Sequence, residues 1–218
     1  VLKPLKLIID NWPQGHVEYI DAVNNPEDPG MGTRKIPFTG ELYIEQDDFM
    51  ENPLPKYYRL YPGNQVRLRY GYIVQCVSCE KDSTTGEVVA VHCTYDPATR
   101  GGNAPDNSKV KSTIHWVSCA HAVPIEVRLY DHLFESERPR DVPPDVDWIS
   151  TVNPQSLQVI PNAWAEPLLA ESKPEQKYQF ERLGYFVCDP DSTQTKKVFN
   201  RTITLKDTWA KLEKKLTK

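Results

Sequence analysis

The most evident absence in this 218-residue sequence is a long apolar run. No stretch approaches the roughly 20 residues that a membrane-spanning helix needs, and the start VLKPLKLIID lacks a signal-peptide pattern. The five cysteines are an odd number without the spacing of a disulfide framework, which favours a reducing compartment. We therefore expect a cytoplasmic protein without a membrane partner. Because the chain begins at Val1 rather than at a methionine, we also expect a piece of a longer protein.

Helical periodicity is scarce as well, and apolar residues instead recur with a period of two. The segments that read as strands are LKLIID, HVEYIDAV, ELYIEQ, QVRLRYGYIVQC, EVVAVHCTYD, STIHWVS, IEVRLYDHLF, SLQVI, YQFERLGYFVCD and FNRTITL. Nineteen prolines and regular turn signals between them are typical of antiparallel barrels or sandwiches. Asp207 is placed to cap one helix, in KDTWAKLEKKL. The predicted fold class is all-β with a short C-terminal helix.

Acidic residues are absent between Glu51 and Glu80, although the formal net charge of the chain is −4. This interval holds KYYRLYPGNQVRLRYGYIVQC, in which arginines lie beside tyrosines. Strand alternation predicts a polar face formed by Gln65, Arg67, Arg69 and Gly71. It predicts that the opposite face, formed by Val66, Leu68, Tyr70 and Tyr72, lies in the core. A glycine in the polar row would let a ligand approach the backbone.

Two interpretations of this segment are equally consistent with the pattern. Guanidinium groups stack on bases and pair with phosphates, and proteins read single-stranded RNA loops through such contacts. Alternatively, the segment is a solvated strand face whose arginines pair with acidic residues of a neighbouring strand.

Residues that carry catalytic or metal chemistry are few and scattered. Cys76 and Cys79 form a CxxC, but a separation of three within a strand points the two thiols to opposite faces. No second CxxC or spaced histidine pair completes a tetrahedral site. Cys119 and His121 share a strand face, yet no orienting or oxyanion group is readable. We predict no metal site and no catalytic residue, and a cysteine- and histidine-dependent enzyme remains a distant alternative.

Several long blocks are similar to a known family. These blocks are RKIPFTGELYIEQDDF, YYRLYPGNQVRLRYGY, CTYD, KVKSTIHWVSCAHAVPIEVRLYDHLF, YQFERLGYF and VFNRTITLKDTWAK. In this order, from Val1 to about Lys211, they closely resemble the C-terminal half of glutaminyl-tRNA synthetases. Archaeal and eukaryotic-type glutamyl-tRNA synthetases share this half. The resemblance implies two antiparallel anticodon-binding β-barrels, related in fold to a 5S-rRNA-binding ribosomal protein.

The resemblance also implies how the chain is divided. In the family, the chain starts a proximal barrel, builds a distal one and then returns, which predicts a proximal barrel from residues 1–25 and 125–218 and a distal barrel from residues 26–124. The proline-rich ERPRDVPPDVDW is the best linker candidate. The ATP-binding signatures of the family's catalytic half do not occur in this sequence. We therefore expect no cofactor on this chain, and ATP and Mg²⁺ in an absent catalytic half.

Contacts with the anticodon follow residue by residue from the resemblance. Arg59 matches the arginine that reads the third anticodon base, and Arg67 and Arg69 match a strand pair at the first base. Further implied contacts are Gln179 and Arg182 at the central and third bases, Thr208 nearby, and Lys56, Tyr58 and Tyr70 at positions where a bacterial relative has glutamine, lysine and asparagine. Lys109 and Lys111 share a strand face and are candidate phosphate contacts.

The function implied by the resemblance is anticodon recognition on behalf of a glutamine–tRNA ligase. The expected partners are tRNA(Gln) and the catalytic half of the same enzyme, and a monomer is expected. The alternatives are the same region of a glutamyl-tRNA synthetase and a stand-alone 5S-rRNA-binding protein.

Overall fold

The computed structural model describes residues 1–101 and 110–205, in which the regular elements are strands and single 3₁₀ turns. The strands are β1 (Pro4–Ile9), β2 (Glu18–Val23), β3 (Thr33–Phe38), β4 (Glu41–Glu45), β5 (Gln65–Leu68), β6 (Ile73–Lys81), β7 (Val88–Tyr95), β8 (Thr113–Ile114), β9 (Val117–Ser118), β10 (Val123–Tyr130), β11 (Leu157–Ala165), β12 (Lys177–Phe180), β13 (Gly184–Cys188) and β14 (Lys197–Ile203). The all-β prediction is confirmed. The predicted C-terminal helix lies outside the described residues.

Short 3₁₀ turns connect some of these strands. They cover Pro29–Met31, Gln46–Asp48, Pro97–Thr99, Trp148–Thr151 and Pro167–Glu171. Aspartates cap several of them, as when the Asp147 carboxylate accepts a hydrogen bond from the Ile149 amide at 3.0 Å. None of the helical turns in the described residues has the length and apolarity of a bilayer-crossing helix.

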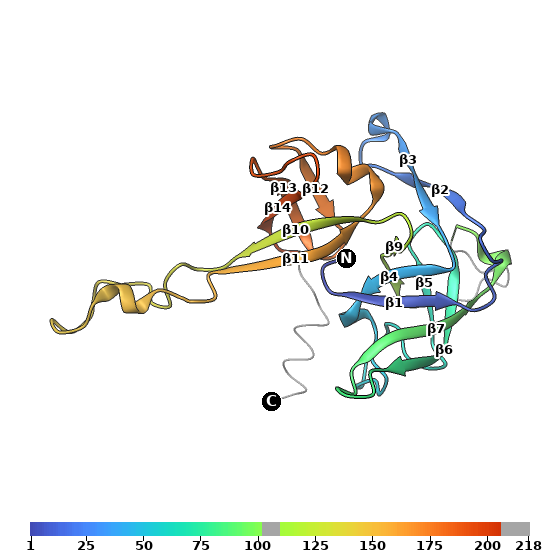
Figure 1. Ribbon diagram of the computed structural model, residues 1–218, viewed down its shortest axis with the longest axis horizontal. Helices are drawn as coiled ribbons and strands as arrows, with labels where there is room; N and C mark the ends of the chain where they lie inside the picture. Colours follow the sequence, from blue (N-terminus) through green and yellow to red (C-terminus); the bar gives the residue numbers. More distant parts are fainter. Residues whose placement is uncertain (102–109, 206–218) are drawn as a thin grey trace. The chain divides into compact units, whose positions relative to one another are not determined.

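The chain forms two compact units. Unit 1 comprises Val1–Val123 with Trp164–Ala170, and unit 2 comprises Pro124–Ala163 with the described residues from Glu171 onward. In unit 1, a seven-stranded sheet runs in the order β8-β5-β6-β7-β1-β4-β9, and β2 pairs with β3 (Figure 1). In unit 2, a five-stranded sheet runs β11-β10-β14-β13-β12. These curled sheets are consistent with β-barrel domains.

The sheets depart from the sequence prediction in strand direction. Most neighbouring pairs are antiparallel, as predicted, but β1 with β7, β5 with β8 and β10 with β14 are parallel. Parallel partners need a long crossover connection. These pairings therefore involve strands far apart in the sequence, which local periodicity does not report.

The pairing of β1 places residues 1–25 in a different unit from the one that the predicted barrels imply. β1 pairs with β4 through Leu5–Ile44 and with β7 through Leu7–Val91, so residues 1–25 belong to the same compact unit as residues 26–123. The predicted grouping of residues 1–25 with 125–218 came from the resemblance alone. The hydrogen bonds of β1 go instead to strands of unit 1.

Segment 164–170 joins unit 1 through two specific contacts. The Trp164 ring stacks on Tyr43, with ring centroids 5.4 Å apart. The Glu166 carboxylate accepts two hydrogen bonds from the Arg34 guanidinium, at 2.5 and 2.8 Å. A bidentate arginine–carboxylate pair fixes geometry as well as charge.

The core of unit 1 is aromatic and aliphatic. Phe38 is fully buried, and its ring contacts Trp12 and Trp116 at centroid distances of 4.8 Å each. Burying a side chain of this size contributes about 1.5–3 kcal/mol to the free energy of unfolding. In unit 2, Phe180 and Phe186 stack at 4.2 Å. Each unit therefore has an apolar core of its own.

Residues 131–156 form a long excursion between β10 and β11. Figure 1 shows this yellow segment extending beyond the ends of the two strands. It contains Glu137–Trp148, the stretch in which the linker was predicted, within unit 2 rather than between the units. The linker prediction is therefore wrong: the prolines mark an excursion between neighbouring strands of one sheet.

Candidate nucleic-acid interface

The tyrosine–arginine segment folds as a hairpin rather than as one long strand. β5 ends at Leu68 and β6 begins at Ile73, with Val66 and Val74 paired between them. Tyr70 has a φ of 62°, and the Gly71 amide donates to the Leu68 carbonyl at 2.9 Å. The prediction of a continuous strand is wrong because the period-two pattern runs on through this turn.

The predicted alternation is correct on both sides of the turn. Val66 and Leu68 are fully buried, and Tyr72 is 6% exposed. The Tyr72 hydroxyl donates to Glu18 at 2.7 Å, and burial together with this hydrogen bond raises the pKa of Tyr72 to about 12. The Tyr72 side chain is thus a core residue that remains protonated at neutral pH.

Gly71 does not open the backbone to a ligand. It is buried, and a Cβ atom at this position would lie 3.1 Å from the Phe38 ring. Glycine is favoured here because a side chain would force the core aromatic ring to shift. The prediction of close ligand approach at Gly71 is therefore wrong.

A hollow lies beside the hairpin, on unit 1. Its volume is about 550 Å³, and its lining comes from two stretches that lie far apart in the sequence, residues 53–65 and 110–111. Its polar and aromatic lining residues are Lys56, Tyr57, Tyr58, Tyr61, Asn64, Gln65 and Lys111. Of the residues predicted to contact RNA, the structure brings Lys56, Tyr58 and Lys111 together here. We call this site the tyrosine hollow.

Tyr58 and Lys111 form the exposed part of the tyrosine hollow. The Tyr58 side chain is 50% exposed, and the Lys111 ammonium lies 4.9 Å from the centre of its ring. Such a cation–π contact orients both groups without neutralising the charge. Lys56 is exposed, and it forms no ion pair with any residue that the structure describes. The tyrosine hollow thus combines an accessible ring with two cations.

The arginines of the segment are held at the edges of this region. Arg59 Nη1 lies 3.2 Å from the Asp47 carbonyl and 3.5 Å from the buried Asp48 carboxylate, and the Arg59 side chain is 14% exposed. Arg67 is on β5, on the face that carries Gln65 of the tyrosine hollow. Arg69 lies in the turn, with its guanidinium 5.0 Å from the Tyr70 ring centre. The Arg59 and Arg69 side chains are therefore positioned by contacts within the unit rather than loosely solvated.

Gln179 and Arg182 lie in unit 2, at the hairpin of β12 and β13. Gln179 is exposed on β12 opposite Tyr185, which in turn pairs with Ile203. Tyr185 is 44% exposed and was not among the predicted site residues, although it follows directly in the same YQFERLGYF block. Arg182 occupies the turn with a φ of 64°. Exposed aromatic rings and amides are the side chains with which proteins contact unstacked bases.

Two predicted residues fall outside the described part of the chain. They are Thr208 and Lys109, and their roles stay predictions. Four polar or aromatic lining members of the tyrosine hollow were not among the predicted contacts: Tyr57, Tyr61, Asn64 and Gln65. All four belong to the tyrosine–arginine segment, and Gln65 shares its strand face with Arg67, which is the signal that pointed to it.

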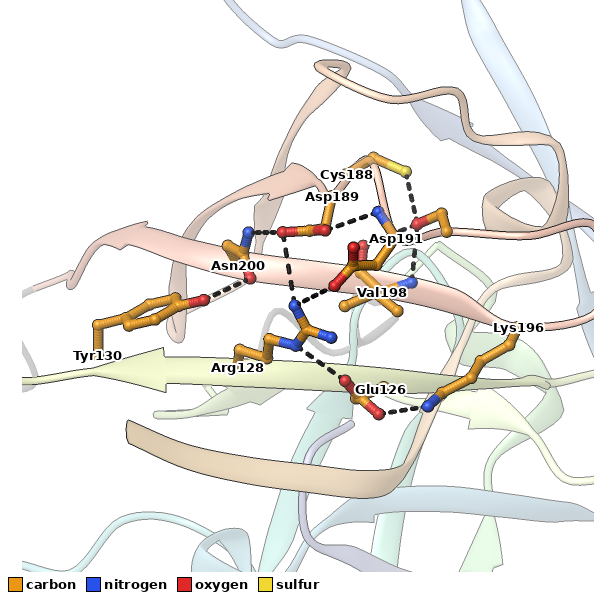
Figure 2. A network of polar contacts seen from close by, with 10 residues as sticks. Glu126, Arg128, Tyr130, Cys188, Asp189, Asp191, Lys196, Val198 and Asn200 are labelled. Atoms are coloured by element: carbon orange, nitrogen blue, oxygen red, sulfur yellow. Dashed lines mark hydrogen bonds and ion pairs between the residues drawn. The ribbon is translucent and has the colours of Figure 1, made fainter. Parts of the chain in front are cut away.

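Unit 2 contains a second group of charged side chains, shown in Figure 2. Arg128 on β10 donates to Glu126 at 2.9 Å and to Asp191 at 2.7 Å, and its Nη1 lies 3.7 Å from Asp189. Lys196 pairs with the other Glu126 oxygen at 2.6 Å. Hydrogen bonds from Lys196 and Arg128 lower the pKa of Glu126 despite its burial. We call these five residues the Arg128 network; its cations are paired with carboxylates of the same unit.

The cysteine and histidine side chains do not form a nucleophile–base pair at Cys119. His121 Nδ1 lies 3.0 Å from the Ser118 hydroxyl, and Ser118 in turn contacts Thr39 at 2.9 Å. Burial raises the pKa of the Cys119 thiol to about 11. A thiol that stays protonated is a poor nucleophile, so this geometry does not favour a cysteine-dependent enzyme.

The CxxC has a geometry that alternation did not predict. The β6–β7 register shifts between Cys76 and Ser78, so Val77 is the extra residue of a β-bulge. Cys79 therefore faces the core beside Cys76, and the prediction of opposed faces is wrong. No group of three or more potential metal ligands occurs among the described residues.

Curled β-sheets that carry an exposed aromatic ring and nearby cations are typical of nucleic-acid-binding modules. Two family models match the chain, and both are described as the anticodon-binding domain of class I tRNA synthetases (E and Q), over residues 1–96 and 113–189. Together they cover most of the chain. The chain belongs to this family of anticodon-binding domains.

Curated relatives are similar to nearly the whole chain. The glutamine–tRNA ligase of Bradyrhizobium diazoefficiens is 56% identical over 211 residues, which are 97% of this chain and 37% of the relative. The glutamine–tRNA ligase of Nitrobacter winogradskyi is 54% identical over 212 residues, with the same coverage. That of Rhodopirellula baltica is 51% identical over 215 residues, 99% of this chain and 35% of the relative. The chain thus spans little more than a third of the length of these relatives.

Proposed function

We propose that this chain is the anticodon-recognition region of a glutamine–tRNA ligase and that it binds tRNA(Gln). The observation that carries the proposal is the tyrosine hollow, in which the exposed ring of Tyr58 lies against Lys111 and shares the lining with Lys56. Its support is chemical: bases stack on aromatic rings, and ammonium groups attract phosphates. The curated relatives named as glutamine–tRNA ligases support the choice of tRNA.

In the proposed mechanism, the chain acts by holding the anticodon bases in fixed positions. Anticodon bases unstack from one another, and one of them stacks on Tyr58 while Lys56 and Lys111 neutralise backbone phosphates. Arg59, held against Asp48, presents its guanidinium to a second base. Gln179 and Arg182 of unit 2 contact the remaining bases. Binding energy gained in this way helps to seat the acceptor end of the tRNA in the catalytic half of a full-length enzyme.

We further propose that the chemistry lies outside this chain. A catalytic half would bind ATP and Mg²⁺ and join glutamine to the tRNA in the cytoplasm. We expect the 218-residue chain to show no amino-acid-dependent ATP–pyrophosphate exchange. Exchange activity in a highly purified sample would overturn this part of the proposal.

Competition between RNAs tests the binding function. Fluorescence anisotropy with a labelled tRNA(Gln) transcript measures displacement by unlabelled tRNA(Gln), tRNA(Glu) or 5S rRNA. We expect tRNA(Gln) to compete most strongly. Equal competition by tRNA(Glu) would favour the glutamyl alternative, and stronger competition by 5S rRNA would favour the ribosomal one. Absence of any RNA binding would refute both the proposal and these alternatives.

A further inference from the structure

Two cysteines face each other across the sheet of unit 1. Cys76 on β6 and Cys93 on β7 are register partners, and their side chains are 1% and 0% exposed. Both belong to the same apolar core cluster, so both thiols point to the same face of the sheet. Neither has a role in the RNA-binding function proposed above.

The backbone hydrogen bonds show which kind of cross-strand pair this is. The Cys76 amide donates to Asn64 at 3.0 Å, and the Cys76 carbonyl accepts from Gly63 at 2.9 Å. The Cys93 carbonyl accepts from Asp10 at 2.8 Å. These backbone groups point away from the partner strand, which defines a non-hydrogen-bonded antiparallel pair. The Cα atoms of such a pair lie about 4.5 Å apart, within the range of about 4.4–6.8 Å for disulfides.

The two thiols influence each other: their interaction lowers the pKa of Cys76 and raises the pKa of Cys93. Deprotonation of the pair therefore begins at Cys76. The Cys76 thiol donates to the Ser78 carbonyl at 3.7 Å, beside the bulge. Thiolate character is what makes a cysteine react with oxidants.

The bulge at Val77 interrupts the β6–β7 ladder directly beside Cys76. Val77 is 57% exposed and has no register partner on β7. Because an interrupted ladder opens locally at a lower free energy than a continuous one, we expect a small oxidant to reach Cys76 at the bulge without global unfolding.

We propose that Cys76 and Cys93 form an intrachain disulfide when hydrogen peroxide oxidises the protein. The Cys76 thiolate attacks one peroxide oxygen, the O–O bond breaks, and the products are the Cys76 sulfenic acid and, after proton uptake, one water. Oxidation of Cys76 removes the thiolate that raised the pKa of Cys93. The Cys93 sulfur then loses its proton as it attacks the Cys76 sulfur, the S–O bond breaks, and the released hydroxide takes up that proton and leaves as the second water. Two thiols lose two electrons, and one peroxide is reduced to two waters.

Peptide mapping of the intact 218-residue chain tests the proposal. After peroxide treatment and alkylation of the remaining thiols, trypsin separates residues 70–81, which contain Cys76 and Cys79, from residues 82–100, which contain Cys93. We expect these two peptides to be joined, with the loss of two hydrogen atoms, and to separate on reduction with dithiothreitol. Fragmentation of the joined peptide distinguishes Cys76 from Cys79.

Two variants sharpen the test. In Cys79→Ser, a change at a partly exposed position, we expect the crosslink to persist; in Cys93→Ala we expect it to disappear. Cys188→Ser, in unit 2, is the control and should leave the crosslink unchanged. A crosslink from Cys79 to Cys93 or to Cys76 would overturn the proposal. So would a Cys76 and Cys93 pair that stays reduced, or that is oxidised only to separate sulfenic or sulfinic acids.

Discussion

The tyrosine hollow of unit 1 and the Arg128 network of unit 2 both gather cationic side chains, but they use the charge differently. In the Arg128 network, Arg128 and Lys196 meet the carboxylates of Glu126, Asp189 and Asp191. In the tyrosine hollow, the Lys111 ammonium lies 4.9 Å from the centre of the neutral Tyr58 ring. Positive charge paired inside a unit stabilises that unit, whereas charge placed over an exposed ring is available to a polyanion.

The largest effect is expected when the Arg128 network is broken. Arg128→Met leaves the Glu126 carboxylate, 8% exposed, without its arginine, and should lower the free energy of unfolding by about 2–3 kcal/mol. The loss stays below that of a fully buried pair because the Arg128 side chain is 22% exposed. Urea unfolding measures it. Lys35→Met, at the exposed Lys35–Asp21 pair, is the control and should change stability by less than about 0.5 kcal/mol.

The same variant tests the comparison itself. Because its charge is neutralised within unit 2, Arg128→Met should leave the affinity for tRNA(Gln) unchanged at temperatures where the protein remains folded. A loss of affinity equal to that of a tyrosine-hollow variant would show that the two regions do not differ as described.

Removal of the stacking surface should have the next largest effect. Tyr58→Ala is expected to weaken RNA binding by about 1–3 kcal/mol, as loss of one stacked base does, while Tyr58→Phe keeps the ring and most of the affinity. Tyr19→Ala is the matched control, because Tyr19 is 55% exposed on β2 and does not line the hollow. Equal affinities of Tyr58→Ala and Tyr19→Ala would remove the ring from the interface.

A smaller effect is expected from the lysine that lies over this ring. Lys111→Ala should weaken the binding of all RNAs alike. It should also reduce the slope of log affinity against log salt concentration by about 0.7–0.9, the value for one phosphate contact. Lys111→Arg retains the charge and should retain the slope. Titrations at several salt concentrations measure both. An unchanged slope in Lys111→Ala would show that this ammonium does not contact phosphate.

The smallest effect is expected on the pH dependence of the free energy of unfolding, at His92, which lies outside both regions. His92 lies between Asp10 at 2.7 Å and Glu80 at 2.8 Å, and hydrogen bonds to these carboxylates raise its pKa. The stabilisation is therefore complete below the unfolded pKa of about 6.5 and is lost as pH rises through the higher folded value. Because both carboxylates are well exposed, we expect less than about 1 kcal/mol. Unfolding at pH 6 and pH 8 should show this loss in the wild type and not in His92→Gln.

Period-two alternation predicted most strands and the buried rows within them, because side chains alternate strictly along a strand. It did not predict the turn at Tyr70 or the bulge at Val77, since each changes the backbone without changing the local pattern of apolar residues. Gly71 shows the same limit: the reason for the glycine is the Phe38 ring, which belongs to another strand.

Only the part of the tyrosine hollow that comes from one continuous segment was predictable from the sequence. Lys56 and Tyr58 stood out beside the arginines in one segment. The contact of Tyr58 with Lys111 depends on a chain crossing that brings residues 110–111 to residues 53–65. The parallel pairing of β5 with β8 produces that crossing. Non-local pairings of this kind leave no periodic signal in a single sequence.

The most direct test of anticodon reading uses anticodon stem-loop RNAs of tRNA(Gln) altered one base at a time, with wild type and Arg59→Lys. Lysine keeps a positive charge next to the buried Asp48 carboxylate but cannot form the bidentate hydrogen bonds of a guanidinium. We predict that the wild type loses about tenfold or more in affinity when one particular base is changed, and that Arg59→Lys loses this discrimination at that base alone. Equal affinity losses for every altered RNA in both proteins would contradict the account.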